Sequence, residues 1–183
     1  MKFIKSTVLT GVLTFGIASS VNAMDTVLYT KLVNDTIEEV TSGDISNINQ
    51  LIAVQKQLVK LGVSGSKEYI RRHPEHAGLL GVVVKNAKSM MHMSLEEIED
   101  QWHQGKYLKS QGYNMSELDH FGELFSLMDS IIHPSTSYIA LKEYKRTRNS
   151  DLLNRAAAEL IEVVEHVAHI GKGGEGTQVS SNH

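Results

Sequence analysis

The sequence predicts an all-α protein, a single-domain bundle of about five to seven helices that follows a cleaved signal peptide. Apolar residues recur every three or four positions over long stretches of the chain, which is the spacing of one helix face. Only 2 Pro occur among the 183 residues, so few positions oppose a helix. No stretch alternates apolar and polar residues as a half-buried strand does.

Residues 1–23 have the order of a secretory signal peptide. A basic start with two lysines precedes a mostly apolar stretch over residues 8–18, and small residues close the segment at Ala23. The apolar stretch is shorter than the roughly 20 residues that a membrane-spanning helix needs. We therefore expect cleavage after Ala23, and a soluble periplasmic or secreted chain without membrane insertion.

The rest of the chain is predicted to form one helical domain over residues 24–170. Its helices are bounded by capping residues at their starts and by glycines or prolines at their ends. The expected main helices cover residues 25–41, 45–61, 74–92, 94–104, 116–133, 134–147 and 151–170, and residues 66–72 are expected to form at most one short helix. Residues 171–183 are rich in Gly and Ser, and we expect them to be a disordered tail.

Several of these boundaries depend on single residues. Gly62 and Gly65 are expected to end the second helix. A capping-box sequence at Ser116 is expected to open a helix that Pro134 ends. Residues 106–115 are expected to form a loop between these helical regions.

Composition excludes several classes of function. The chain has no Cys, so it has no disulfide framework, no thiolate metal site and no thiol nucleophile. Removal of residues 1–23, which carry two lysines and no acidic side chain, leaves a net charge more negative than the −3 of the whole chain. Nothing in that charge favours a nucleic-acid partner. No nucleophile elbow or phosphate-binding glycine loop is present, so no catalytic residue is predicted and a non-enzymatic function is favoured.

The nine His are the chemical excess of this sequence. On ideal helices, His76 lies on an apolar stripe, His103 flanks another, and Glu117-x-x-His120 places a carboxylate beside an imidazole on an inner face. We predict that His76, His103, Glu117 and His120 converge in a polar metal site, because buried polar groups need partners. The alternative is that Glu117 only favours the first helical turn and that His120 donates to a backbone carbonyl.

Three imidazoles and a carboxylate suit Zn²⁺ or Cu²⁺. A non-covalent haem is a variant of this hypothesis, with Met90 or Met128 as the possible second axial ligand.

Two other groups of possible ligands are predicted to have ordinary roles. The run Met90-Met91-His92-Met93 contains soft ligands for copper, but a continuous helix turns His92 away from the first two, so only unwinding would bring them together. His166 and His169 fall away from the apolar stripe of the last helix, on the side of Glu162. They are interpreted as solvent-facing residues that interact with the helix C-terminus.

Two classes of function remain open from the sequence. The first is an exported helical bundle that binds a transition metal or haem through inward-facing histidines. The second is a cofactor-free periplasmic interaction or accessory protein whose partner is another protein.

Overall fold

The computed structural model describes residues 24–43, 45–120 and 122–170, except for the side chain of Glu117. The expected signal peptide, 1–23, and the expected tail, 171–183, lie outside these residues. Both therefore stay predictions, as does the boundary of the domain between them.

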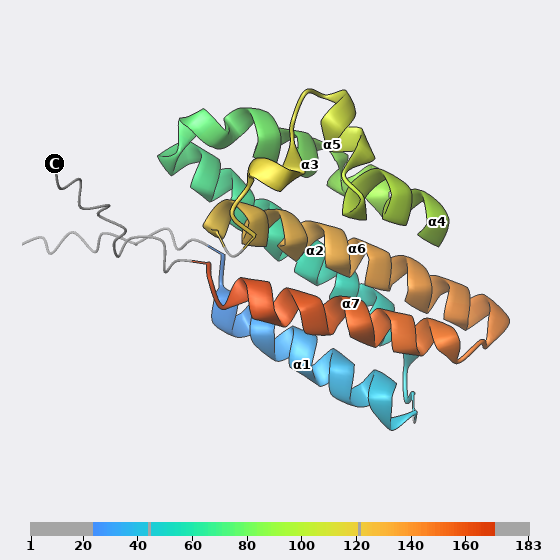
Figure 1. The fold of residues 1–183 in the computed structure, drawn as a ribbon. Helices are drawn as coiled ribbons and strands as arrows, with labels where there is room; N and C mark the ends of the chain where they lie inside the picture. The colour runs from blue at the N-terminus through green and yellow to red at the C-terminus, as the bar shows by residue number, and fades with distance from the viewer. Residues whose placement is uncertain (1–23, 44, 121, 171–183) are drawn as a thin grey trace, which may run out of the picture.

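Four long helices form a closed ring at the centre of the molecule: α1 (Thr26–Ser42), α2 (Ile48–Arg72), α6 (Glu123–Thr147) and α7 (Asp151–Val167). Each packs on the next in this order, and α7 packs back on α1 (Figure 1). Short connections join α1 to α2 and α6 to α7, so these partners run antiparallel. The predicted all-α bundle is confirmed.

A second layer of shorter elements covers α2 and α6 on one side (Figure 1). It contains Trp102, Ile98 and Leu108, each buried in the main hydrophobic core. The described part of the chain has no strand. In chain order the elements are η1 (Pro74–His76), α3 (Ala77–Met90), α4 (Leu95–Ile98), the π-helical turn η2 (Glu99–His103), α5 (Lys106–Ser110) and η3 (Met115–Glu117).

The prediction that Gly62 and Gly65 end a helix is wrong, because α2 runs through both. These glycines allow other parts of the chain to approach the helix closely. A Cβ at position 62 would lie 2.6 Å from the carbonyl oxygen of Ser130, and one at position 65 would lie 2.5 Å from the Cβ of Met24. The lack of a side chain thus serves helix packing rather than helix termination.

The prediction that Pro134 breaks the helix is also wrong, because α6 contains it. Proline cannot donate the backbone hydrogen bond to the carbonyl four residues earlier, which here belongs to Ser130. That carbonyl instead accepts a hydrogen bond of 2.9 Å from the hydroxyl of Tyr29 on α1. A side chain from another helix therefore satisfies the group that proline leaves without its usual donor.

The expected helix start at Ser116 is displaced, because α6 begins only at Glu123. Met115–Glu117 forms one 3-10 turn, capped by the side chain of Asn114, and Leu118 then has an extended backbone with ψ of 143°. Leu118 packs against the hydrophobic core in this conformation. The helical geometry assumed for Glu117-x-x-His120 is therefore absent.

Two smaller differences concern the second layer. Part of the expected loop 106–115 is helical, as α5. Helix α3 stops at Met90, before the soft-ligand run is complete.

Among the described helices, none combines the length and the apolar character that crossing a membrane requires.

Candidate metal centre

Three side chains from three elements meet inside the bundle: His103 at the end of η2, His133 in α6 and Glu159 in α7. One potential ligand atom from each lies within 4.8 Å of the other two. Glu159 Oε2 lies 2.9 Å from His133 Nδ1 and 3.4 Å from His103 Nε2. Ligands of a tetrahedral zinc ion lie roughly 3.3 Å apart, given metal–ligand bonds of about 2.0–2.2 Å. The two distances from Glu159 are thus already near the spacing that an ion imposes.

The local backbone explains how these side chains become buried. His103 ends a π-helical turn that also buries Trp102 to 1% exposure, and such wide turns are frequent at functional sites. His133 precedes Pro134 in the uninterrupted part of α6, and the residue is only 5% exposed. Glu159 lies on α7 where that helix packs against α6.

Outer contacts hold two of these ligands in place. Arg155 Nη2 lies 2.6 Å from a carboxylate oxygen of Glu99 and 3.5 Å from Glu159 Oε1. Glu159 Oε2 is left to face the two imidazoles. His103 Nε2 also hydrogen-bonds with the hydroxyl of Thr136 at 2.8 Å. An arginine in this position can orient a carboxylate that binds a metal. Thr136 contacts the same nitrogen of His103 that faces Glu159, so this hydrogen bond must open before Nε2 can bind an ion.

The cluster lies beside a cavity of about 300 Å³. None of the described residues that line it is Lys or Arg. The buried Nε1–H of Trp102, which lines the cavity, has no hydrogen-bond acceptor among the described residues. The lining residues are Trp102, His103, Met115, His120, Phe125, Asp129, Ile132, His133, Glu162, Glu165 and His166.

A second group of polar side chains lies on the other side of the His133 ring. Asp129 Oδ2 is 3.8 Å from His133 Nε2 and 3.3 Å from His166 Nε2. The His120 ring lies edge-on to that of His166, with 4.7 Å between their centres. His133 therefore presents one ring nitrogen to Glu159 and the other to Asp129.

Burial determines the charge states in this region. It lowers the pKa of His133 and of His166 to about 4, and it lowers the pKa of His103 as well. Burial raises the pKa of Asp129 well above its usual value, and the charges of Glu162 and Glu159 add to this rise. Burial also raises the pKa of Glu159. Neutral imidazoles and poorly solvated carboxylates are suited to receive a cation.

Among the nominated residues whose side chains the structure describes, two lie at one cavity and the third lies elsewhere. His103 belongs to the three-residue cluster, and His120 lines the same cavity. His76 lies elsewhere: its ring stacks on Tyr69 at 5.7 Å, and its side chain is 37% exposed. The side chain of Glu117 lies outside the described part of the chain.

Sequence reasoning did not nominate His133 and Glu159, and it placed His166 wrongly. His166 is 5% exposed and lines the cavity. The prediction assumed one buried face on the last helix, whereas α7 packs against both α1 and α6. A wider arc of its surface is therefore buried, including the side that was expected to face solvent.

One signal in the sequence could have found His133 and His166, but not Glu159. An acidic residue precedes a histidine by four positions in four pairs: Glu99 and His103, Asp129 and His133, Glu162 and His166, Glu165 and His169. Each pair shares a helix face in ordinary helical geometry, and the histidines of the first three pairs line one cavity. The repetition of the spacing is more informative than any single pair.

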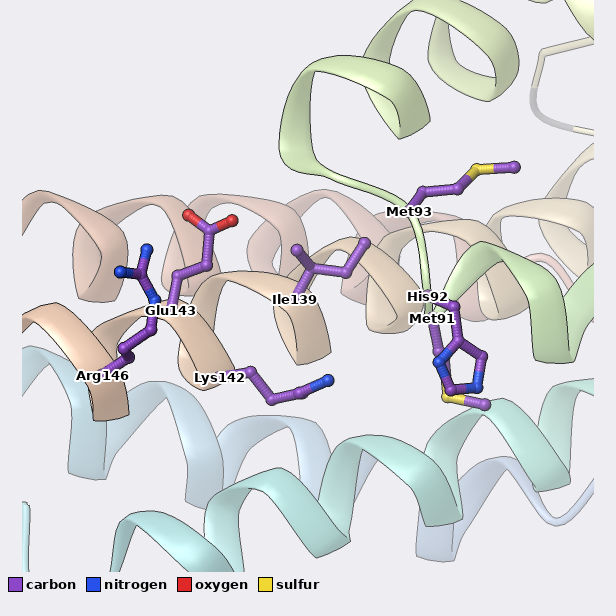
Figure 2. Close-up of a pocket in the computed structure, with 7 residues that line it drawn as sticks. All are labelled: Met91, His92, Met93, Ile139, Lys142, Glu143 and Arg146. Carbon is purple, nitrogen blue, oxygen red and sulfur yellow. The ribbon is translucent and has the colours of Figure 1, made fainter.

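The soft-ligand run lies at a different hollow, of about 310 Å³. Although the helix ends before His92, the ligands do not converge: Figure 2 shows Met91 and His92 on one side of the turn and Met93 pointing to the other. Met90 and Met128, the candidate haem ligands, are fully buried in the hydrophobic core. Neither lines the histidine cavity.

Comparisons with known proteins give no family for this chain. No family model, no curated protein and no solved structure matches it. The support for a metal ion at this position therefore comes from the geometry and the electrostatics of the cluster.

Proposed function

We propose that this protein binds a divalent transition-metal ion of the Zn²⁺ class through His103, His133 and Glu159. The observation that carries the proposal is the convergence of three ligand atoms, from three separate elements, within 4.8 Å of one another. Two imidazole nitrogens and one carboxylate oxygen favour Zn²⁺ or Cu²⁺ over Ca²⁺ and Mg²⁺, which prefer all-oxygen sites.

The surroundings support an ion at this position. Burying ionisable groups without a partner is costly, and Glu159 is only 8% exposed. Arg155 lies at one of its oxygens and the imidazoles lie at the other. Oε2 makes a hydrogen bond of 2.9 Å with His133 Nδ1, and a cation between Oε2 and the imidazoles would replace this bond with metal–ligand bonds.

The centre is also proposed to act in an exported protein. The support for export is the basic, apolar and small-residue order of residues 1–23. Mass spectrometry of the protein from its native cells should find a mature chain that begins at or near Met24. Recovery of the uncleaved chain would contradict export by this route.

Metal binding can be tested by calorimetric titration of the chelator-treated protein with Zn²⁺. We expect at least one tight equivalent. Glu159→Gln and His133→Gln should each weaken it by more than the roughly 10–100-fold that losing an outer partner costs. Circular dichroism of each variant would establish that the helical fold is retained.

Matched control variants come from the hollow in Figure 2. Glu143→Gln and His92→Gln make the same chemical changes beside a space of similar volume, and neither should change the affinity. Absence of tight binding by Zn²⁺ and Cu²⁺, or equal losses in all four variants, would refute the proposal.

A further inference from the structure

The cavity contains more metal-ligating side chains than one ion uses. After His103, His133 and Glu159 are assigned to the proposed ion, Asp129, His166 and His120 remain in the lining. Asp129 and His166 are each 5% exposed, so they are not surface groups that meet by chance. Their facing atoms, Oδ2 and Nε2, lie 3.3 Å apart, which is near the spacing of two ligands on one tetrahedral ion.

We propose that a second divalent transition-metal ion binds between Asp129 and His166, with His120 as its third protein ligand, so that the His133 ring separates two ions. This inference rests on the proposed function, because it adds an ion to the same centre. The donors are again two imidazoles and a carboxylate, which suit Zn²⁺ or Cu²⁺.

His120 is placed to complete this second site. Its ring lies 4.7 Å from that of His166, edge to face, and it lines the cavity although the residue is exposed. The His120 ring also lies 4.7 Å from the ring of Phe125, so this side chain must turn if it is to reach an ion beside Asp129. The second site is therefore less preorganised than the first, where three ligand atoms are already within 4.8 Å, and its ion should bind more weakly.

The charges of the cavity agree with two ions. Asp129, Glu162 and Glu165 line it, and Glu159 adjoins it. Arg155 lies beside Glu159 but is shared with Glu99. The neighbouring charges of Glu162 and Glu159 contribute to the raised pKa of Asp129, and divalent ions would favour the ionised form of these carboxyl groups.

His133 lies between the two proposed sites and is a ligand of the first ion only. Its Nδ1 faces Glu159 at 2.9 Å, and its Nε2 faces Asp129 at 3.8 Å. A metal-bound histidine commonly donates its other ring N–H to a carboxylate. Asp129 can accept that hydrogen bond while its charge also serves the second ion.

Calorimetric titration of the full chain with Zn²⁺ tests this arrangement through stoichiometry. We expect two equivalents, the first tighter than the second. His120→Ala and His166→Gln should remove the weaker equivalent and keep the tighter one, whereas Glu159→Gln should remove the tighter one. His92→Ala, at the hollow in Figure 2, is the matched control and should keep both. His120→Ala changes an exposed residue, so the test does not depend on how His166→Gln folds.

Electron paramagnetic resonance of the Cu²⁺-loaded protein gives a second readout. Two ions on either side of one imidazole ring should produce a half-field signal from coupled spins, and either His120→Ala or Glu159→Gln should abolish it. A single equivalent that Glu159→Gln removes and His120→Ala and His166→Gln leave intact would overturn the second ion only. No stoichiometric binding of either metal would overturn the proposed function and the second ion together.

Discussion

Helix α6 lines two hollows of similar volume, about 300 Å³ beside His133 and about 310 Å³ beside Ile139. The first is lined by buried histidines and by carboxylates. The second has one exposed histidine, and the cationic side chains of Lys142 and Arg146 extend along it (Figure 2). The two hollows therefore have similar volumes but different charges and hydrogen-bonding groups along their walls.

The two hollows differ more in the burial of their side chains and in the contacts around them than in the number of possible metal ligands. The run Met91-His92-Met93 has soft donors next to each other in sequence, yet their side chains diverge (Figure 2). His103, His133 and Glu159 are far apart in sequence, yet helix packing brings their ligand atoms together. Positive charge beside the second hollow would further oppose a cation there.

The largest expected difference between the hollows is thermal stabilisation by metal. An ion at a thousand times its dissociation constant adds about 4 kcal/mol to the free energy of unfolding. For a domain of this size that is a rise of roughly 8–16 °C in Tm. Scanning calorimetry with excess Zn²⁺ should show this rise in the wild type and in Glu143→Gln, and a much smaller rise in Glu159→Gln. An equal rise in Glu159→Gln would place the ion elsewhere.

The next expected effect concerns the residues that hold the ligands. Arg155→Gln removes the contact of 3.5 Å to Glu159 Oε1, and the carboxylate loses its orientation. The affinity for Zn²⁺ should fall by about 10–100-fold, whereas Arg146→Gln at the other hollow should change it little. Removing a positive charge would by itself favour a cation, so tighter binding in Arg155→Gln would show that charge outweighs orientation.

The free energy of unfolding should also depend on pH through the histidine cavity. Burial lowers the pKa of His166 to about 4, while an unfolded chain protonates histidine near pH 6.5. Between these values the unfolded state binds the extra proton, so the contribution of His166 to stability is present above about pH 6.5 and is lost as the pH falls to about 4. The slope is at most about 1.4 kcal/mol per pH unit.

Urea unfolding of the chelator-treated protein at several pH values checks this sign. The stability of the wild type relative to His166→Gln should decline as the pH falls over that range. His92→Gln, which changes an exposed histidine at the other hollow, is the control. The neighbouring charged and titratable groups, Asp129, His120, His133, Glu165 and His169, are present in all three proteins. A difference from His166→Gln that grows with acidity would contradict the prediction.

The sequence predicted the helices better than their ends. Amphipathic periodicity depends on which side of a helix faces the core, and it located the four long helices. The helix ends predicted at Gly62 and Pro134 were wrong because of contacts with residues far away in sequence. Ser130 packs closely against Gly62, and the hydroxyl of Tyr29 supplies the hydrogen-bond donor that Pro134 lacks.

The candidate centre was only partly accessible to the same reasoning. His103 was identified because it flanks an apolar face, but its neighbours could not be chosen from spacing alone. His166 was assigned to solvent because a helix with two packing partners has a wider buried arc than one stripe suggests. Which helices are neighbours is a property of the whole fold, and that information decides which side chains meet.

The smallest predicted effect concerns the helix that carries both hollows. Tyr29→Phe removes the hydroxyl that donates to the carbonyl of Ser130 at 2.9 Å, and a buried carbonyl without a donor costs about 1–3 kcal/mol. In Pro134→Ala the new backbone N–H can donate to the same carbonyl, so Tyr29→Phe should cost about 1 kcal/mol less in that background. Urea unfolding of the four proteins in this cycle measures the coupling. Zn²⁺ titration should then show whether the loss reaches His133, one residue before Pro134, while a Tyr144→Phe control near the other hollow leaves the affinity unchanged. Additive free energies would mean that Tyr29 does not compensate for the proline, and that α6 remains continuous there for another reason.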